Sequence, residues 1–559
     1  MRIPGTPRTH VALVASASAA LLLASPAVAG ARTVDDTTLV PHSHFTMQPD
    51  GSTGLSTTTT GANIPNIDSV KSTIRTYYGA GSNGIANKTD SPYISEMSDI
   101  EAKALDSLPT VDPADNKAVV FDADDTTLWT YDMEDGAMHF NFDPVLQGQW
   151  VHDGKFPATP GMVAFVDAVA AKGYNIYGIT GRSASQEDDT VANLVNVGYS
   201  EFNADNFFTK FDSTHPKPDY LDCNSGVDPD DAAKCTTVEY KAGTRKYIET
   251  PVADGGLGQD IVLNIGDQFS DLQGGFSDDS LKLPNPTYYL PSADIKGAPA
   301  GDADLTPGTS FTMAPNGSSG ATEGGEGIPN IDSVKSTIRN FYGADPVTHK
   351  ANKQTSPYIT EMTDFAAKWA PKLRTACANQ VNKGIKPAVV FDADDTTLWT
   401  YDMEDAKMAF NFDPVLQNTW VQEERFPAVP GMVKVVRAAA AGGCKVVGLT
   451  GRNNAQRTAT LDNLAKYYYD TKTDNSLFRS QYYFTKWTST DEPPAYVDCS
   501  LDGDATKCST IDYKASTRKH VQDDMGLHII ANLGDQFSDL IGGSSDRAVK
   551  LPNPTYYLP

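Results

Sequence analysis

The amino-acid sequence predicts an α/β protein of two tandem domains, each a parallel sheet flanked by helices with a small helical cap insert. The first observation behind this prediction is an internal repeat, because AVVFDADDTTLW at 118–129 recurs almost letter for letter at 388–399. The second is the alternation of strand-like and helix-like apolar runs within each copy, which is typical of βαβ units. The third is a polar signature at the end of each main strand, the edge of an open α/β sheet where ligands bind.

Both copies also open with IPNIDSVKSTIR and close with KLPNPTYYLP. In the opening motif, Ile67, Val70 and Ile74 share one face of a predicted helix, and Asn66 is its expected N-cap. The opening motif lies at 64–75 and 328–339, and the closing motif at 282–291 and 550–559. Each copy therefore has the size of an ordinary domain.

The first residues have the composition of an export signal. Arg2 and Arg8 form a basic region, residues 11–24 an apolar one, and Ala27-Val28-Ala29 a cleavage site. The apolar run is short for a membrane span, so we expect a secreted protein with no membrane anchor in its mature form. The expected organisation is a signal peptide (1–29), a flexible lead-in (30–61), a first domain (62–291), a linker (292–327) and a second domain (328–559).

Length and charge restrict the function classes. At 559 residues the chain is too long for one compact core. Its 45 Lys and Arg against 71 Asp and Glu give a formal net charge of −26. Such a surface repels nucleic-acid backbones, so we expect no nucleic-acid binding. A small anionic substrate is still compatible with this charge, because a metal ion or a lysine can reverse the field inside one pocket.

Six cysteines fall into three suggestive pairs, and export would permit disulfides. The pairs are Cys223 with Cys235, Cys499 with Cys508, and Cys377 with Cys444. The first two pairs flank equivalent polar loops in the two copies. The third occurs only in the second copy, and this joint presence suggests a bond between its members. A zinc site is the weaker interpretation, because the chain has no C-x-x-C and no His at ligand spacing.

The remaining elements follow from hydrophobic runs and their lengths. The apolar run at 118–121 predicts a buried strand of a parallel sheet. The polar, aromatic insert at 131–156 is too long for an ordinary loop and predicts a small cap over the strand ends. Further expected elements are a helix at 160–172 and strands at 174–179, 207–208, 261–265 and 281–283.

The first strand ends in three carboxylates and two threonines, at Asp122, Asp124, Asp125, Thr126 and Thr127. Burying charge is costly unless it is paired or bound to a metal. Since ligands of open α/β sheets bind at this edge, the cluster predicts a cation site there. An EF-hand calcium loop is disfavoured, because threonines stand where it needs a further acid and a glycine.

Three more signatures follow in the same order in both copies. In the first copy they are T-G-R at 180–182, Y-K at 240–241 and G-D-Q-F-S-D at 266–271. Taken singly each is weak: a turn with a solvated arginine explains T-G-R, and a surface charge explains one lysine. Together with D-x-D-x-T, all at or near strand ends and all repeated, they form one pattern.

This ordered pattern resembles the four motifs of the haloacid dehalogenase (HAD) superfamily of phosphatases, and FDADDTTLW is most similar to its secreted acid phosphatase branch. That branch includes bacterial class B and class C enzymes and plant vegetative storage proteins. The resemblance covers nearly the whole of both copies and implies two tandem Rossmann-like HAD domains. It further implies a phosphomonoesterase that acts on a small-molecule phosphomonoester through an aspartyl-phosphate, with one Mg²⁺ per domain.

The resemblance also implies a role for each motif residue of the first copy. Asp122 is the expected nucleophile and Asp124 the general acid and base, which a departing alcohol requires. Thr180 and Lys241 are expected to bind the phosphoryl oxygens, whereas Asp125 stands where many superfamily members have glycine. The expected supporting residues are Thr126 and Asp271, and the expected metal ligands are Asp122, Asp124 through its backbone carbonyl, and Asp267.

The second copy repeats every one of these roles, which predicts two working sites per chain. Its residues are Asp392 and Asp394 (catalytic), Thr450 and Lys514 (phosphate-binding), Thr396 and Asp539 (supporting), and Asp392, Asp394 and Asp535 (metal). Some relatives that serve as storage proteins have lost the nucleophile, and its retention in both copies argues against that role here. Activity is expected at acidic pH, which helps to keep the general acid protonated.

Several alternatives stay open at this stage. Lys210 follows the third strand and competes with Lys241 as the motif lysine. Trp129, Tyr131 and Phe140 form either a floor for the organic part of a substrate or part of the cap core, which is the commoner role. The alternative functions are a phosphotransferase that uses the same intermediate, and a non-catalytic secreted storage or phosphate-binding protein. The sequence does not indicate the physiological substrate or the oligomeric state.

Overall fold

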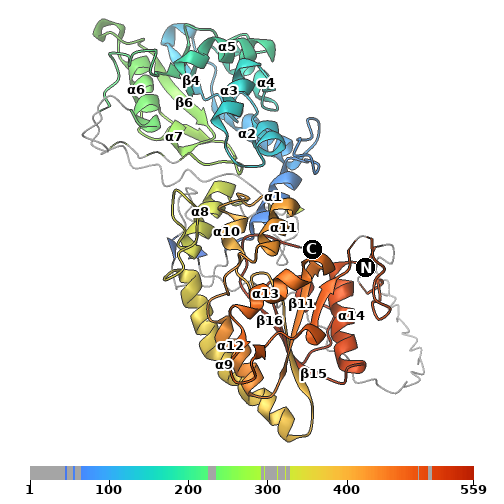
Figure 1. The fold of residues 1–559 in the computed structure, drawn as a ribbon. Helices are drawn as coiled ribbons and strands as arrows, with labels where there is room; N and C mark the ends of the chain where they lie inside the picture. Colours follow the sequence, from blue (N-terminus) through green and yellow to red (C-terminus); the bar gives the residue numbers. More distant parts are fainter. Residues whose placement is uncertain are drawn as a thin grey trace, which may run out of the picture.

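A computed structural model describes residues 64–223, 235–290, 292, 295, 328–488, 490–501 and 507–558 of the chain (Figure 1). Outside these ranges it describes only the backbone of four short strands: β1 (Phe45–Thr46), β2 (Leu55–Ser56), β8 (Phe311–Thr312) and β9 (Ala321–Thr322). The expected signal peptide lies outside the described residues, as do nearly all of the lead-in and linker. Below, the first repeat means residues 64–290 and the second repeat residues 328–558.

Each repeat contains a five-stranded, fully parallel sheet, as the sequence predicts. The spatial order is β5-β4-β3-β6-β7 in the first repeat and β14-β11-β10-β15-β16 in the second. The first sheet consists of β3 (Lys117–Phe121), β4 (Asn175–Ser183), β5 (Phe207–Lys210), β6 (Asp260–Gly266) and β7 (Ser280–Lys282). The second consists of β10 (Pro387–Phe391), β11 (Lys445–Asn453), β14 (Tyr483–Lys486), β15 (His528–Gly534) and β16 (Ala548–Lys550).

Helices cover both faces of each sheet (Figure 1). In the first repeat they are α1 (Ile67–Tyr77), α2 (Pro92–Ser107), α3 (Pro144–His152), α4 (Met162–Ala171), α5 (Glu187–Asn196), α6 (Thr237–Glu249) and α7 (Phe269–Leu272). In the second they are α8 (Ile331–Tyr342), α9 (Pro357–Asn382), α10 (Tyr401–Glu404), α11 (Pro414–Gln422), α12 (Met432–Ala441), α13 (Arg457–Ala465), α14 (Thr510–Asp523) and α15 (Phe537–Leu540). None of the helices in the described residues is both long and apolar enough to cross a membrane.

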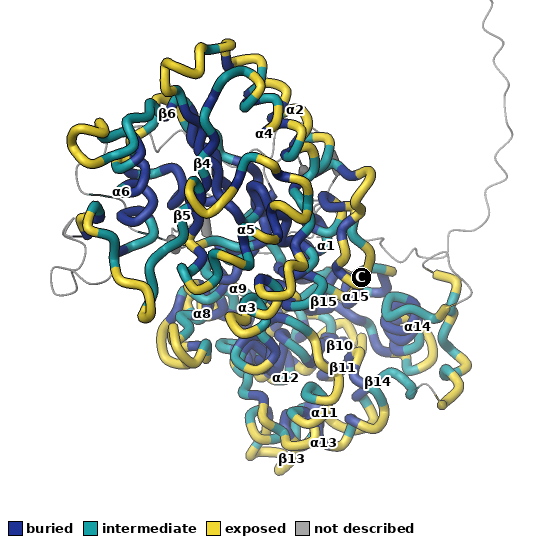
Figure 2. The backbone as a smooth tube through the Cα atoms, turned by 90° about the horizontal axis from the view of Figure 1, so that it is seen from above, coloured by how far each residue is buried: buried dark blue, intermediate teal, exposed yellow. Residues whose placement is uncertain are grey.

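Strand β3 lies at the centre of its sheet and is apolar because both of its faces are covered. Successive side chains point to opposite faces, so Val119 and Phe121 enter one hydrophobic cluster while Ala118 and Val120 enter another. Figure 2 shows the buried course of the neighbouring strands β4 and β6 inside their shell of helices. The carboxyl end of β3 is therefore held from both sides.

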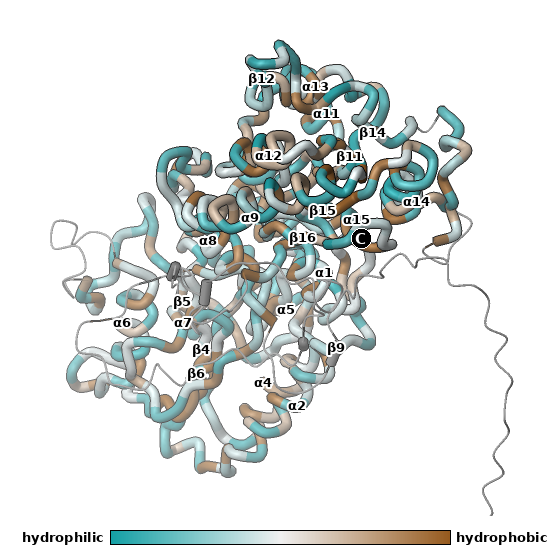
Figure 3. Tube along the Cα trace, turned by 90° about the horizontal axis from the view of Figure 1, so that it is seen from below, coloured by the Kyte–Doolittle hydropathy of each residue, from teal (hydrophilic) through white to brown (hydrophobic). Residues whose placement is uncertain are grey.

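Figure 3 shows the hydrophilic face that the outer helix α14 of the second repeat presents.

The insert after β3 forms the expected small helical cap. It contains a π-helix at Asp132–Ala137 followed by α3, and its counterpart contains α10 and α11. Trp129, Tyr131 and Phe140 are each at most 2% exposed and belong to the hydrophobic core. Tyr131 stacks on Tyr78 with ring centroids 4.0 Å apart. These aromatic residues therefore form the core beneath the cap, and a substrate floor must come from elsewhere.

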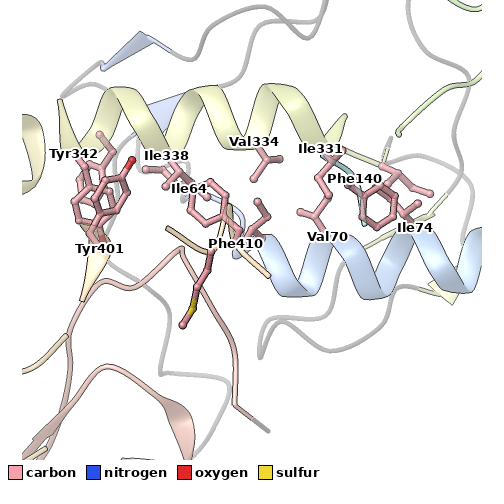
Figure 4. Packing of buried hydrophobic residues seen from close by; sticks show 14 of the residues in the cluster. Ile64, Val70, Ile74, Phe140, Ile331, Val334, Ile338, Tyr342, Tyr401 and Phe410 are labelled. Carbon is pink, nitrogen blue, oxygen red and sulfur yellow. The ribbon is translucent and has the colours of Figure 1, made fainter. Parts of the chain in front are cut away.

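The two repeats share one continuous hydrophobic cluster. Helices α1 and α8 lie side by side across the boundary, with Val70, Ile74, Ile331 and Val334 between them (Figure 4). Asn66 caps α1 by accepting from the N–H groups of residues 68 and 69, as the sequence predicts. What the sequence did not predict is that the apolar face of α1 packs against the other repeat.

The three disulfides join the cysteine pairs suggested by the sequence. Cys377 on α9 reaches Cys444, which directly precedes β11, and so ties the long helix of the second repeat to its sheet. One expectation needs correction, since β4 runs from Asn175 to Ser183 and includes T-G-R within the strand. Its last residues pair with β5 after a register shift, which turns Arg182 inward.

A buried carboxyl group in α2 predicts a pH-dependent stability. Glu101 is 8% exposed, its Oε1 has no hydrogen-bond partner, and burial raises its pKa to about 8. The folded protein therefore holds a proton on Glu101 from about pH 4 to about pH 8, where the unfolded chain has lost it, so stability falls as pH rises through that window. Glu101→Gln removes this decrease in stability. We expect the variant and the wild-type chain to have equal free energies of unfolding at about pH 4, and the variant to be the more stable at about pH 9.

Urea unfolding at the two pH values measures the difference, with the exposed Asp99→Asn on the same helix as the control. The second repeat carries Ala366 at the position of Glu101, which shows that the fold does not need this carboxylate. A difference between the variant and the wild-type chain that is the same at both pH values would contradict the prediction.

Candidate active site

Asp122 directly follows β3 at the carboxyl edge of the sheet. Its N–H donates to the Ile265 carbonyl of β6 at 3.0 Å, which continues the pairing of the two strands by one residue. Strand β3 has β4 on one side and β6 on the other, so the chain reverses its direction of winding here. Such switch points leave a crevice outside the strand ends, and the motif residues gather in it.

A lysine lies between two carboxylates at the centre of this crevice. The Nζ of Lys241 on α6 donates to Oδ1 of Asp122 at 2.5 Å and to Oδ1 of Asp271 at 2.5 Å. All three side chains are at most 7% exposed. Lys210, the alternative motif lysine, lies at the end of β5 and is half-buried.

The second repeat reproduces this arrangement. Lys514 donates to Oδ1 of Asp392 at 2.9 Å and also to Asp539. These side chains are again at most 7% exposed. A buried lysine of this kind is stable as a cation because two carboxylates face it. Loss of the lysine would leave both carboxylates without this cationic partner.

Asp267, at the start of the G-D-x-x-x-D motif, completes an acidic cluster. Carboxylate oxygens of Asp122, Asp267 and Asp271 all lie within 4.8 Å of one another, and so do those of the second repeat's Asp392, Asp535 and Asp539. The Oδ2 of Asp267 accepts hydrogen bonds from Asn285 (2.6 Å), Gln268 (2.7 Å) and the Tyr288 hydroxyl (3.1 Å). Thr126 Oγ1 is 3.5 Å from its other oxygen, Oδ1. Asp267 is thus fixed in place by neutral donors.

The three carboxylates of the cluster carry more negative charge than the two lysines that face them, Lys241 and Lys282, can offset. Burial raises the pKa of Asp122 well above its usual value, and the neighbouring Asp271 raises it further, while Lys241 lowers it. Burial and Asp271 likewise raise the pKa of Asp267 to about 6. Three hard oxygen donors with surplus negative charge are the ligand set that Mg²⁺ and similar cations prefer, so either cluster could bind a metal ion.

The loop that follows Asp122 is held by its own hydrogen bonds. Asp125 has a φ of 48°, in the left-handed region that favours glycine, which accounts for the glycine of other superfamily members. Here the Asp125 carboxylate accepts from the Thr130 N–H at 3.0 Å and from its hydroxyl. Thr127 Oγ1 donates to the Asp122 carbonyl at 3.0 Å. The same left-handed turn occurs at Asp395, with a φ of 45°.

Arg182 contributes more to the site than its T-G-R motif indicates. It is buried, and its guanidinium donates two hydrogen bonds to Asp124, from Nε to Oδ2 at 3.1 Å and from Nη2 to Oδ1 at 2.6 Å. Its Nη1 donates to Thr190 at 3.1 Å. A planar guanidinium fixes the position of a carboxylate in this bidentate way, which a turn with a solvated arginine would not do. Arg452 holds Asp394 in the same way.

The motif residues line one cavity in each repeat. The cavity of the first repeat has about 350 Å³ and that of the second about 620 Å³. The first is lined on its inner side by Asp122, Asp124, Thr180, Arg182 and Lys241. Its lining also includes the buried Met133 and Glu134 and the aromatic Tyr288. Asp332, Phe142 and Leu290 line it where it meets solvent, since Asp332 is partly exposed and the other two are exposed.

Two groups of these lining residues were not predicted from the sequence. Glu134 and Phe142 lie in the cap insert, whose conformation the sequence leaves open. Tyr288 and Leu290 belong to the closing motif KLPNPTYYLP, whose place at the end of each copy indicates a domain boundary rather than a site. The exact repetition of that motif was the signal that could have marked it as part of the site.

The chain belongs to the HAD superfamily, subfamily IIIB (acid phosphatase), whose family model matches residues 58–291, 325–490 and 498–559. The resemblance inferred from the motifs is confirmed by this match. Membership of the family defines the chain as an enzyme of the phosphomonoesterase class, a hydrolase. The match extends over both repeats, in agreement with the two equivalent clusters.

Curated relatives are plant proteins. The chain is 29% identical over 207 residues to the stem 28 kDa glycoprotein of Glycine max, covering 36% of this chain and 69% of that protein. It is 32% identical over 172 residues to acid phosphatase 1 of Solanum lycopersicum, covering 30% and 58%. It is 26% identical over 236 residues to vegetative storage protein 1 of Arabidopsis thaliana, covering 42% and 74%. Among solved structures, the class C acid phosphatase from Bacillus anthracis matches with a TM-score of 0.23 and 18% identity, covering 36% of this chain and 87% of that one.

Loss of the bidentate hydrogen bonds that Arg182 and Arg452 donate to Asp124 and Asp394 should impair turnover. In a chain carrying Arg182→Lys and Arg452→Lys, a point charge replaces each planar fork, and both carboxylates lose their fixed orientation. We expect kcat for p-nitrophenyl phosphate to fall about tenfold or more, since small displacements of a catalytic group can cost up to about 10²-fold. Steady-state kinetics measures the loss. The exposed Arg437→Lys is the matched control, and an unchanged kcat in the double variant would contradict the assignment.

Proposed function

We propose that this chain is a secreted, metal-dependent acid phosphatase that hydrolyses phosphomonoesters through an aspartyl-phosphate intermediate, with two active sites per chain. The observation that carries the proposal is the lysine held between a strand-end carboxylate and a helix carboxylate, Lys241 in one repeat and Lys514 in the other. A cation in that position can neutralise both the nucleophile and the incoming phosphoryl oxygens, which is the main requirement of phosphoryl transfer.

In the first half-reaction, a carboxylate oxygen of Asp122 attacks phosphorus. The bond from phosphorus to the ester oxygen breaks, and the departing alkoxide takes a proton from Asp124. Thr180 and Lys241 are the proposed ligands of the phosphoryl oxygens, because both line the cavity beside Asp122. Arg182 holds the Asp124 carboxylate by hydrogen bonds, in the orientation that we propose faces the leaving group.

In the second half-reaction, water attacks the phosphorus of the aspartyl-phosphate. Asp124 takes one proton from this water, the acyl phosphate bond breaks, and inorganic phosphate leaves. Asp122 is thereby restored as a carboxylate and Asp124 as an acid. The second repeat would perform the same two steps with Asp392 and Asp394.

The proposed metal is one hard divalent cation per repeat, Mg²⁺. Asp122, the backbone carbonyl of Asp124 and Asp267 would hold it in the first repeat, with Asp271 as a neighbour that already orients Lys241. When bound, such an ion supplies positive charge to the phosphoryl oxygens as charge builds up on them. Asp392, the backbone carbonyl of Asp394 and Asp535 are the corresponding proposed ligands in the second repeat, and Asp392 and Asp535 belong to its acidic cluster.

Two observations support export to an oxidising compartment. All three cysteine pairs among the described residues form disulfides, which persist mainly outside the cytosol. The first residues also have the composition of a signal peptide. A small-molecule phosphomonoester is the proposed substrate, since each cavity has the size of a small-ligand site.

Replacing the two nucleophiles tests the mechanism. Asp122→Asn and Asp392→Asn together should abolish release of p-nitrophenol from its phosphate, because an amide cannot form the intermediate. Either single substitution should leave partial activity from the intact repeat. The measurement is the initial rate at saturating substrate.

The conservative Asp99→Asn, on the exposed face of α2, serves as the control. Full activity in the double variant would refute the aspartyl-phosphate mechanism. A wild-type chain that binds phosphate tightly but shows no turnover would favour the storage or phosphate-binding alternative.

Metal removal should inactivate the enzyme reversibly. EDTA treatment followed by dialysis leaves three buried carboxylates per repeat, with only Lys241 and the nearby Lys282, or Lys514 and Lys550, to balance them. We expect phosphatase activity to be lost and the melting temperature to fall, and Mg²⁺ to restore both, because an ion that binds only the folded state stabilises it. Activity and melting temperature that are both indifferent to EDTA would exclude the proposed metal.

A further inference from the structure

The two repeats hold each other by a reciprocal contact between the start of one and the end of the other. The Ile67 N–H donates to the Pro554 carbonyl at 2.9 Å, and the Asn66 side chain donates to the carbonyls of Asn553 (3.1 Å) and Tyr556 (2.6 Å). The opposite contact pairs the Ile331 N–H with the Pro286 carbonyl (2.9 Å) and the Asn330 side chain with the carbonyls of Asn285 (3.1 Å) and Tyr288 (2.6 Å). The repeats thus form an internal dimer with twofold pseudosymmetry.

This contact reaches directly to the acidic cluster on each side. The Asn285 carbonyl accepts from Asn330 of the second repeat, while the Asn285 side chain donates to Asp267 at 2.6 Å. One residue therefore connects the opposite repeat to a proposed metal ligand. The equivalent connection runs from Asn66 through Asn553 to Asp535, with a final hydrogen bond of 2.8 Å.

One carboxylate from each repeat enters the active-site cavity of the other. Asp68 on α1 lines the cavity that contains Asp392, and Asp332 on α8 lines the cavity that contains Asp122. The Tyr557 N–H fixes Asp68 by donating to its Oδ2 at 3.1 Å, and Tyr289 does the same for Asp332 at 3.1 Å. Each of the two carboxylates keeps 37% of its side chain exposed.

Buried lysines lock these two helices onto the opposite cap. Lys71 is 5% exposed and donates to the Phe410 carbonyl and, at 2.9 Å, to Asn411. Lys335 is 4% exposed and donates to the Phe140 carbonyl. Each lysine also lies one helical turn from the carboxylate, Lys71 at 3.6 Å from Asp68 and Lys335 at 3.1 Å from Asp332. The position of each carboxylate in the cavity is therefore set by the packing of the two repeats.

We propose that each active site is completed by the other repeat, and that Asp68 and Asp332 select the leaving group of the substrate. The proposal rests on the proposed function, because it assigns the outer wall of the same two cavities. The phosphoryl group would lie at the inner end near Lys241 or Lys514, so the alcohol must extend toward the outer carboxylate.

The outer wall is acidic and partly apolar. In the second repeat Asp68 shares it with Glu404, Phe412 and Leu558, and Phe412 is 67% exposed. In the first repeat the same positions are held by Asp332, Glu134, Phe142 and Leu290. Burial raises the pKa of Glu404 and of Glu134 well above its usual value, so the negative charge of this wall comes from Asp68 or Asp332. That carboxylate repels a second phosphate or a carboxylate on the leaving group, and it attracts ammonium or hydroxyl donors. The preferred substrates are therefore monoesters whose alcohol is neutral or cationic and donates hydrogen bonds.

Two phosphomonoesters of similar size test this selection in the full chain: 2-aminoethyl phosphate, with a cationic leaving group, and 2-phosphoglycolate, with an anionic one. In a chain carrying Asp122→Asn only the second site turns over. There, Asp68→Asn should lower the ratio of kcat/KM for 2-aminoethyl phosphate to kcat/KM for 2-phosphoglycolate about tenfold, as expected for the loss of one charge-assisted contact. In a chain carrying Asp392→Asn the dependence should move to Asp332→Asn.

Thr76→Ala, at an exposed position of α1, is the control variant, and thermal melting checks that each chain is folded. The crossed dependence would establish that the repeats complete each other's sites. If Asp68→Asn leaves the ratio unchanged in the Asp122→Asn chain, or lowers it only in the Asp392→Asn chain, the proposal is wrong. Turnover by a chain that lacks both nucleophiles would instead refute the proposed function, whatever the ratio does.

Discussion

The buried contact of one lysine with two aspartates is the constraint on which each repeat depends. Lys241 joins the tip of β3, helix α6 and helix α7 through Asp122 and Asp271, and β3 is distant in the chain from the two helices. Taking three charges out of water is costly, and it is offset here only because the geometry satisfies all of them. The rest of the fold can be understood as the support that keeps these groups in place.

That support has a hierarchy. The apolar β3 is packed on both faces and paired on both edges, so its carboxyl end is held between β4 and β6. Neutral donors from the closing motif then position Asp267, and Arg182 positions Asp124. Each carboxylate to which we assign a role in the chemistry thus has its own partner, and the surplus of negative charge that remains is the physical reason to expect a cation.

Duplication changes what one domain can do. In a single copy the apolar face of the opening helix and the end of the closing motif would face solvent. In the tandem chain α1 and α8 pack together, and each closing motif is capped by an asparagine from the other repeat (Figure 4). The two sites are consequently built from one shared interface, although each has its own complete set of motif residues.

The sequence by itself determined the duplication, the parallel strands, the order of the motifs and the disulfide pairs, because these depend on hydrophobic periodicity, repetition and local spacing. The same local signals identified Asn66 as a cap and Asp122 as a strand-end acid. Only the tertiary structure decided that Arg182 is buried against Asp124, and that Asp68 belongs to the cavity of the second repeat. Sequence spacing carries no information about which surfaces meet across hundreds of residues, because that choice is made by the packing of complete domains.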